Sequence, residues 1–207
     1  MKNFKDYINI NEWRYKSNSN VREQDVYKFV PKDRYHLEQL IIERLKENIK
    51  EPYLLDIDTS NIKNFSDLFS ADPDDYLRRH CRINTEEIIT LDLSSWNTSN
   101  VTTMNGMFYR CKNLKTLHIE NFDMSSIQDL GAMCRYCESL KYVDISKWKI
   151  KKFGNNKSVE VSCIFAGCTS LEEVRGIENL DPNSLTNKNF AFLNSYNVKN
   201  KPNNWEF

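Results

Sequence analysis

The sequence lacks most of the features that mark enzymes, membrane proteins and nucleic-acid-binding proteins. Its 29 basic and 29 acidic residues balance, so no excess of positive charge points to a nucleic acid as partner. No stretch approaches the roughly 20 apolar residues that cross a bilayer, and residues 1–8 lack the apolar segment of a secretory signal. Phosphate-binding loops, nucleophile elbows and zinc-protease motifs are also missing from the sequence. We therefore expect a cytoplasmic protein that is not an enzyme, uses no cofactor and binds neither membranes nor nucleic acids.

The sequence does contain one pattern that occurs three times between residues 90 and 171. Its copies open, at an even spacing, with the alternating triplets Leu91-Asp92-Leu93, Leu117-His118-Ile119 and Val143-Asp144-Ile145. Alternation of apolar and polar residues predicts a short strand whose apolar side chains face the core. A fixed period of this length is typical of a solenoid, in which each unit buries its apolar side against its neighbours.

The most complete copy reads LDLSSWNTSNVTTMNGMFYRC from Leu91 to Cys111. This stretch resembles the BspA-like class of bacterial leucine-rich repeats, which is also seen in mycoplasma lipoprotein repeats. The resemblance extends over roughly residues 51–193. It implies a repeat fold with little enzymology attached, and many members of the class are surface proteins that contact host molecules.

These observations predict an α+β fold, a leucine-rich-repeat-like solenoid of about five turns with an N-terminal helical cap. The chain then divides into an N-terminal arm (1–32), a capping helix (33–50), the repeats (51–193) and a C-terminal tail (194–207). In each repeat, the segment after the strand is expected to return as a helix. Asp33 is the expected N-cap of the capping helix. Helical spacing places these apolar residues on one of its faces: Leu37, Leu40, Ile41, Leu45 and Ile49.

Three further segments each have two interpretations. The arm, residues 1–32, either folds over the first repeat or becomes ordered on a partner. The acidic cluster Asp72–Asp75, in an insertion after Phe69, is either a solvated turn or a cation site, although it lacks the spacing of a calcium loop. Trp205 and Phe207 in the tail either dock on the open end of the solenoid, as we expect, or bind elsewhere.

Six cysteines are the residues that most invite a metal or disulfide interpretation. Cys134 and Cys137 form a C-x-x-C pair, but Cys111, Cys137 and Cys168 fall at the same position of successive repeats. A recurring core position favours buried thiols that pack as small apolar residues. We therefore expect reduced cysteines and no metal site.

The outward residues of the predicted strands form the candidate partner-binding site. His118 falls between Asp92 and Asp144 on adjacent strands, where exposed polar pairs are a simpler interpretation than a catalytic group. Because this row is mostly acidic, a basic or polar protein surface fits it best. The candidate residues are Asp56, Asp58, Thr90, Asp92, Ser94, Thr116, His118, Glu120, Tyr142, Asp144, Glu173 and Arg175.

The sequence therefore predicts a non-enzymatic protein–protein interaction module whose partner is unidentified. One alternative is a structural component of an assembly, either a phage particle or a homo-oligomer, joined through the arm. A phage-encoded chain of that kind would be found in the virion. A second alternative is a surface adhesin that is exported without a recognisable signal.

Overall fold

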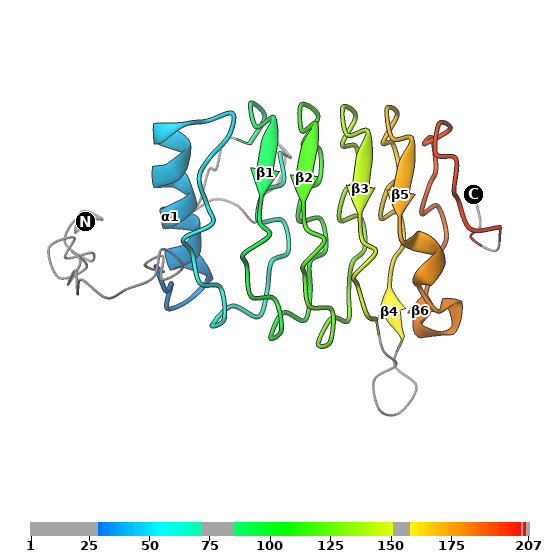
Figure 1. Cartoon of the computed structure of the whole chain (residues 1–207), viewed down its shortest axis with the longest axis horizontal. Coiled ribbons are helices and arrows are strands. Elements are labelled where there is room, and N and C mark those ends of the chain that lie inside the picture. The colour runs from blue at the N-terminus through cyan, green and yellow to red at the C-terminus, as the bar shows by residue number, and fades with distance from the viewer. Residues whose placement is uncertain (1–28, 72–84, 151–157, 204, 206–207) are drawn as a thin grey trace, which may run out of the picture.

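The computed structural model describes residues 29–71, 85–150, 158–203 and 205. These residues contain one α-helix, which stands at one end of a row of short strands (Figure 1). The helix and the four strands of the row are α1 (Arg34–Glu47), β1 (Thr90–Asp92), β2 (Thr116–His118), β3 (Tyr142–Asp144) and β5 (Glu173–Arg175). The remaining elements are β4 (Val159–Glu160), η3 (Ile177–Asn179), η4 (Pro182–Ser184) and β6 (Leu185–Thr186).

The predicted leucine-rich-repeat-like solenoid of about five turns is wrong. Within the described ranges, the strands form separate two-stranded parallel sheets, β1–β2, β3–β5 and β4–β6. The segments that were expected to return as helices are not helical. They contain left-handed residues at regular positions, such as Gly106 and Arg110, both with φ of 60°, and Tyr136, with φ of 61°. A right-handed α-helix does not tolerate such residues, so these segments form successive tight turns instead.

Backbone hydrogen bonds join the tight turns into a regular structure that we call the turn ladder. Every second amide of a turn segment donates to a carbonyl oxygen of the following segment. For example, the amide of Gly106 donates to Gly131 O at 2.9 Å, and the amide of Phe108 donates to Met133 O at 2.8 Å. The segments of the ladder are 65–71, 104–110, 130–136, 161–167 and 189–194.

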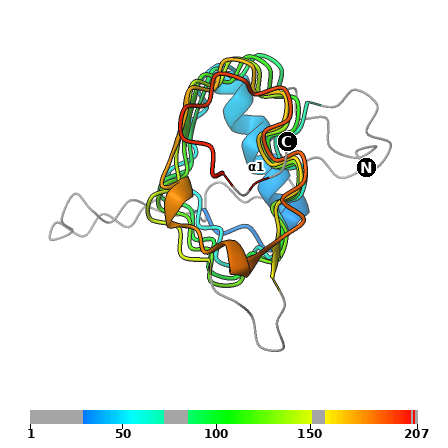
Figure 2. The same cartoon turned by 90° about the vertical axis from the view of Figure 1, so that its right-hand side faces the viewer.

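The helix α1 forms within the predicted range 33–50 and lies across one end of the molecule (Figure 2), but it ends at Glu47, so Ile49 follows the helix instead of lying on its apolar face. The side chain of Asp33 accepts a hydrogen bond from the amide of His36 at 2.9 Å, which confirms the predicted N-cap. Arg44 connects the helix to the next segment through an ion pair with Asp56 at 2.5 Å. The helix buries the apolar residues Leu37, Leu40, Ile41 and Leu45.

A cluster of buried apolar residues extends from α1 to the C-terminal tail. Stacked phenylalanines run through it: the rings of Phe69 and Phe108 lie 5.8 Å apart, and those of Phe165 and Phe192 lie 5.6 Å apart. Trp205 continues the series, because its side chain is 2% exposed and its ring lies 5.7 Å from that of Phe192. The predicted docking of Trp205 is therefore confirmed.

Some predicted features lie outside the described residues, namely most of the arm, the Asp72–Asp75 cluster and Phe207. The described end of the arm pairs with the segment after α1. There the amide of Phe29 donates to Asp56 O at 2.7 Å, and Phe29 forms a parallel bridge with Ile57. Within the part of the chain that the structure describes, we find no helix with the length and apolar character of a membrane span.

Candidate interaction surface

The strands β1, β2, β3 and β5 bury their middle residues and direct their first and last residues outward. The register places Asp92 opposite His118 and Asp144 opposite Arg175. Figure 1 shows the four strands side by side, so their outward residues share one side of the molecule, which we call the strand face. Its residues are Thr90, Asp92, Thr116, His118, Tyr142, Asp144, Glu173 and Arg175.

The two aspartates of the strand face are held in place by the turns that follow their strands. Asp92 Oδ1 accepts a hydrogen bond from the amide of Ser94 at 3.0 Å, and Asp144 Oδ1 accepts one from the amide of Ser146 at 2.8 Å. Aspartate commonly bonds the backbone two residues further on in this way. The two carboxylates are therefore oriented before any partner binds, which lowers the entropy cost of association.

Arg175 adds a positive charge beside Asp144. The Arg175 Nη1 and Asp144 Oδ2 atoms lie 3.5 Å apart, with the two side chains 61% and 22% exposed. Partial burial raises the pKa of the Asp144 carboxyl, but hydrogen bonds from Ser146 and the charge of Arg175 outweigh that effect. The pKa of Asp144 therefore lies below its usual value, and the carboxylate stays ionised at neutral pH.

The structure places Asp56 and Asp58 away from the strand face, contrary to the sequence-based prediction. Asp56 is 9% exposed and is paired with Arg44. Burial raises its pKa despite the nearby arginine. Asp58 lies in a turn, where its Oδ1 accepts a hydrogen bond from the amide of Ser60 at 3.0 Å.

The error comes from a false match between two triplets. Leu55-Asp56-Ile57 looks like Leu91-Asp92-Leu93 in the sequence. The backbone shows a different equivalence, because Ile57 N donates to Leu54 O as Trp96 N donates to Leu93 O. Leu54 therefore corresponds to Leu93, and the outward residues of the first segment lie earlier in the chain.

Two further candidate residues, Ser94 and Glu120, lie just beyond β1 and β2 and are half-buried. The carbonyl of Ser94 accepts a hydrogen bond from Asn121 Nδ2 at 3.3 Å, which ties together the turns after these strands. These residues therefore adjoin the strand face at its rim.

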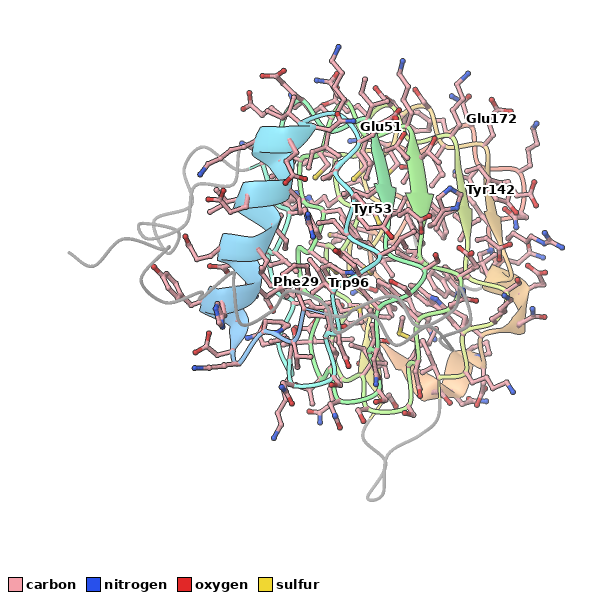
Figure 3. All side chains as sticks on the ribbon, turned by 60° about the vertical axis from the view of Figure 1, so that its left-hand side comes forward. Phe29, Glu51, Tyr53, Trp96, Tyr142 and Glu172 are labelled. Carbon is pink, nitrogen blue, oxygen red and sulfur yellow. The ribbon has the colours of Figure 1, made fainter. Side chains whose placement is uncertain are left out.

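Sequence reasoning missed Glu51 and Tyr53, which extend the strand face beyond β1. The amide of Thr90 donates to Lys50 O at 3.1 Å, and Thr90 Oγ1 lies 3.4 Å from Glu51 Oε1. Figure 3 shows Tyr53 on the same side of the molecule as Tyr142, and the two rings are 52% and 42% exposed. The sequence does contain a signal for Tyr53. Because Leu54 corresponds to Leu93, Tyr53 corresponds to Asp92, which is an outward residue of β1.

The buried cysteines support the turn ladder from inside. Cys111, Cys137 and Cys168 are buried free thiols, as predicted. Each thiol donates to a backbone carbonyl of the preceding segment at 3.0–3.1 Å, and Ser195 takes the same position in the last segment. Burial raises the pKa of Cys137 and Cys168 well above the usual value, which keeps both thiols protonated as donors. No group of three potential metal ligands gathers among the described residues.

A comparison with known families identifies the group to which the chain is related. The family model described as "Mycoplasma protein of unknown function, DUF285" matches residues 79–205, more than half of the chain. The chain belongs to this family. The DUF285 match includes all four strands of the strand face and the docked Trp205, and it begins after α1. It agrees with the mycoplasma part of the resemblance noted above. No curated protein and no solved structure matches the chain.

Proposed function

We propose that this member of the DUF285 family is a non-enzymatic protein–protein interaction module that binds its partner through the strand face. One observation carries the proposal. Asp92, His118, Asp144 and Arg175 form an outward polar row on successive strands, and its two carboxylates are fixed by backbone amides. Such a row supports recognition of a complementary polar surface, because oriented charges give specificity at low entropic cost.

The charge of the face favours a basic partner. The acidic residues of the strand face and its extension are Glu51, Asp92, Asp144 and Glu173, and Arg175 is the basic residue beside them. Opposite charge on a partner would speed its approach and exclude acidic competitors.

Two tyrosines add a different kind of contact. Tyr53 and Tyr142 are 52% and 42% exposed, and tyrosine is enriched among the residues that contribute most to binding. The resemblance of residues 91–111 to BspA-like repeats also supports binding rather than catalysis, because many members of that class contact other molecules.

Charge reversal on the strand face tests the proposal. The double substitution Asp92→Lys with Asp144→Lys should lower capture of a basic partner from an extract of the source organism by about tenfold or more. The matched control is Asp58→Lys with Asp123→Lys. These aspartates accept the same kind of hydrogen bond, from Ser60 and Ser125, but lie in turns off the face. Quantitative mass spectrometry of the captured proteins would measure both effects.

The thermal midpoints of the two double variants should be close, since both lose one turn hydrogen bond at each site and the exposed Asp144–Arg175 pair contributes little stability. Equal capture by the two variants would show that the strand face is not the binding surface. The neutral pair Asp92→Asn with Asp144→Asn keeps an acceptor for each amide and removes only charge. We expect it to weaken capture less than charge reversal does, and to make capture less sensitive to salt.

A further inference from the structure

The hydrogen bonds of the turn ladder all run in one direction, from the amides of one segment to the carbonyls of the next. The last segment therefore has amide donors with no following segment to accept from them. Amides at one position of the ladder, those of Gly106, Ala132 and Cys163, each donate to a carbonyl of the following segment at 2.8–3.2 Å. The amide of Phe190 occupies this position in the last segment. By the same register, Phe192 follows Phe108, Cys134 and Phe165, and Asn194 follows Arg110, Tyr136 and Gly167. Within the described part of the chain, the amides of Phe190, Phe192 and Asn194 have no acceptor.

Large exposed side chains lie in and next to this segment of the chain. Phe190 is 50% exposed, Leu193 is 39% exposed and Tyr196 is 79% exposed. At the position of Phe190 the preceding segments carry the small residues Gly106, Ala132 and Cys163. At this position the last segment therefore presents a large apolar side chain that these three segments lack, and exposed apolar surfaces mark sites of interaction.

The described tail leaves Phe190 and Asn194 of this edge exposed. After Ser195 the chain turns toward the strands, where the amide of Lys199 donates to Glu172 O at 2.9 Å and Asn197 Nδ2 donates to Thr169 O at 2.8 Å. Trp205 then covers the core at the ring of Phe192. Figure 2, which looks at this end, shows the tail crossing the inside of the outline. The tail thus covers the apolar core and Phe192, which is 1% exposed, while Phe190 and Asn194 stay exposed at the rim.

We propose that this end of the turn ladder is a second docking surface, distinct from the strand face. It takes a backbone segment of a partner protein that follows the same tight turns as the segments of the ladder. Carbonyl oxygens of that segment accept hydrogen bonds from the amides of Phe190 and Asn194, and its apolar side chains pack on Phe190 and Leu193. Addition of a partner backbone to an open hydrogen-bonding edge is an established mode of peptide recognition.

The hydrogen-bond polarity excludes a folded second copy as the occupant. The same end of another copy offers amides too, and donors do not pair with donors. The opposite end of another copy is covered by α1, which buries Leu37 and Ile41, and Arg34 Nη1 donates to Asn64 O there at 3.2 Å. A single segment of a different protein meets neither obstacle.

A synthetic peptide of residues 187–195 is the probe. In the chain, its carbonyls at Asn189, Ala191 and Leu193 already accept amides of the preceding segment. A second copy of this peptide can therefore offer the same carbonyls, in the same register, to the open end. Fluorescence anisotropy of the labelled peptide with the full chain should give saturable one-to-one binding, and a scrambled peptide should not bind.

Substitutions in the full chain complete the test. Phe190→Asp with Leu193→Asp should weaken peptide binding by about tenfold or more, whereas Tyr35→Asp, at a 60% exposed aromatic on α1, should leave it unchanged. Phe190→Ser with Leu193→Ser provides a milder pair, and circular dichroism checks the folding of every variant. Absence of saturable binding, or equal binding by all variants, would overturn the proposal. So would light scattering that shows self-association of the full chain lost in the Phe190→Asp/Leu193→Asp variant, because the occupant would then be a second copy.

Discussion

The two ends of the molecule are closed in different ways. At the N-terminal end, α1 buries several apolar residues on the core, Arg34 donates to the backbone carbonyl of Asn64, and Arg44 pairs with the carboxylate of Asp56. At the C-terminal end, Trp205 covers the core at Phe192, but the amides beside it have no acceptor among the described residues. The difference shows that burial of apolar surface and pairing of backbone groups are separate requirements. Only the second is left open for a partner.

The largest effect is expected at the helix-covered end. Ile41→Asp places an unpaired charge at a position that is 0% exposed, and such a substitution removes about 5 kcal/mol or more of stability. Because the total free energy of unfolding of a domain is about 5–15 kcal/mol, most molecules of this variant should be unfolded. Urea denaturation followed by circular dichroism measures the loss. The same substitution at exposed Tyr35 should cost about 0.5 kcal/mol or less, and a similar loss at both sites would contradict the packing of α1.

Removal of the Trp205 side chain at the C-terminal end should lower the stability by a smaller amount. Trp205→Ala deletes a side chain that is 2% exposed and uncovers Phe192. Truncation of a buried tryptophan to alanine lowers the free energy of unfolding by about 3–5 kcal/mol. Urea denaturation would again measure it. A loss below about 1 kcal/mol would show that Trp205 contributes little to this end, and the contrast between the two ends would then be greater than proposed.

A smaller effect is expected at Ser195, which replaces cysteine in the last segment. Its Oγ donates to Phe165 O at 2.6 Å and accepts from the amide of Cys168 at 2.9 Å. Ser195→Ala removes both bonds and leaves only the longer bond of 3.3 Å from the Cys168 amide to Phe165 O, so it should cost about 0.5–1.5 kcal/mol. Ser195→Cys should cost less, because Cys137 and Cys168 donate to carbonyls from the same position. Calorimetry compares the variants, and equal melting points would argue against a role for these hydrogen bonds.

The smallest effect on stability is expected from the ionisation of Asp144, which lies on β3. Its pKa is lowered in the folded chain, so the stability it contributes is present above the usual value of 3.8 and is lost as the pH falls through the folded pKa. Arg175→Gln should raise the pKa of Asp144 toward the usual value, as followed by NMR of the carboxyl group. Lys199→Gln, which breaks the pair with Glu172 instead, should leave it unchanged. Both side chains of the Asp144–Arg175 pair are partly solvated, so the change in stability should be small.

The sequence was most informative where side-chain pattern alone decides the structure. Helical spacing and the cap at Asp33 located α1, and apolar alternation located the inward residues of β1, β2, β3 and β5. The recurring position of the cysteines identified them as buried thiols.

The sequence misled where backbone conformation decides the structure. Arg110, Ala132, Tyr136 and Cys163 adopt positive φ although none is glycine, and residue type gives no signal of such turns. A spacing that matched a helix in these segments therefore belonged to a ladder of turns. The misplacement of Asp56 has another cause, because two triplets of similar composition concealed the true register.

Amide hydrogen exchange of the full chain tests most directly whether the amides at the C-terminal end are unpaired. The amides of Cys163 and Gly167 donate to the last segment at 3.2 and 2.7 Å, so they should exchange only when the structure opens. The equivalent amides of Phe190 and Asn194 should exchange at rates close to those of an unstructured peptide. Equal protection of the two pairs would contradict the account, because it would mean that the chain already supplies the acceptors which we assign to a partner.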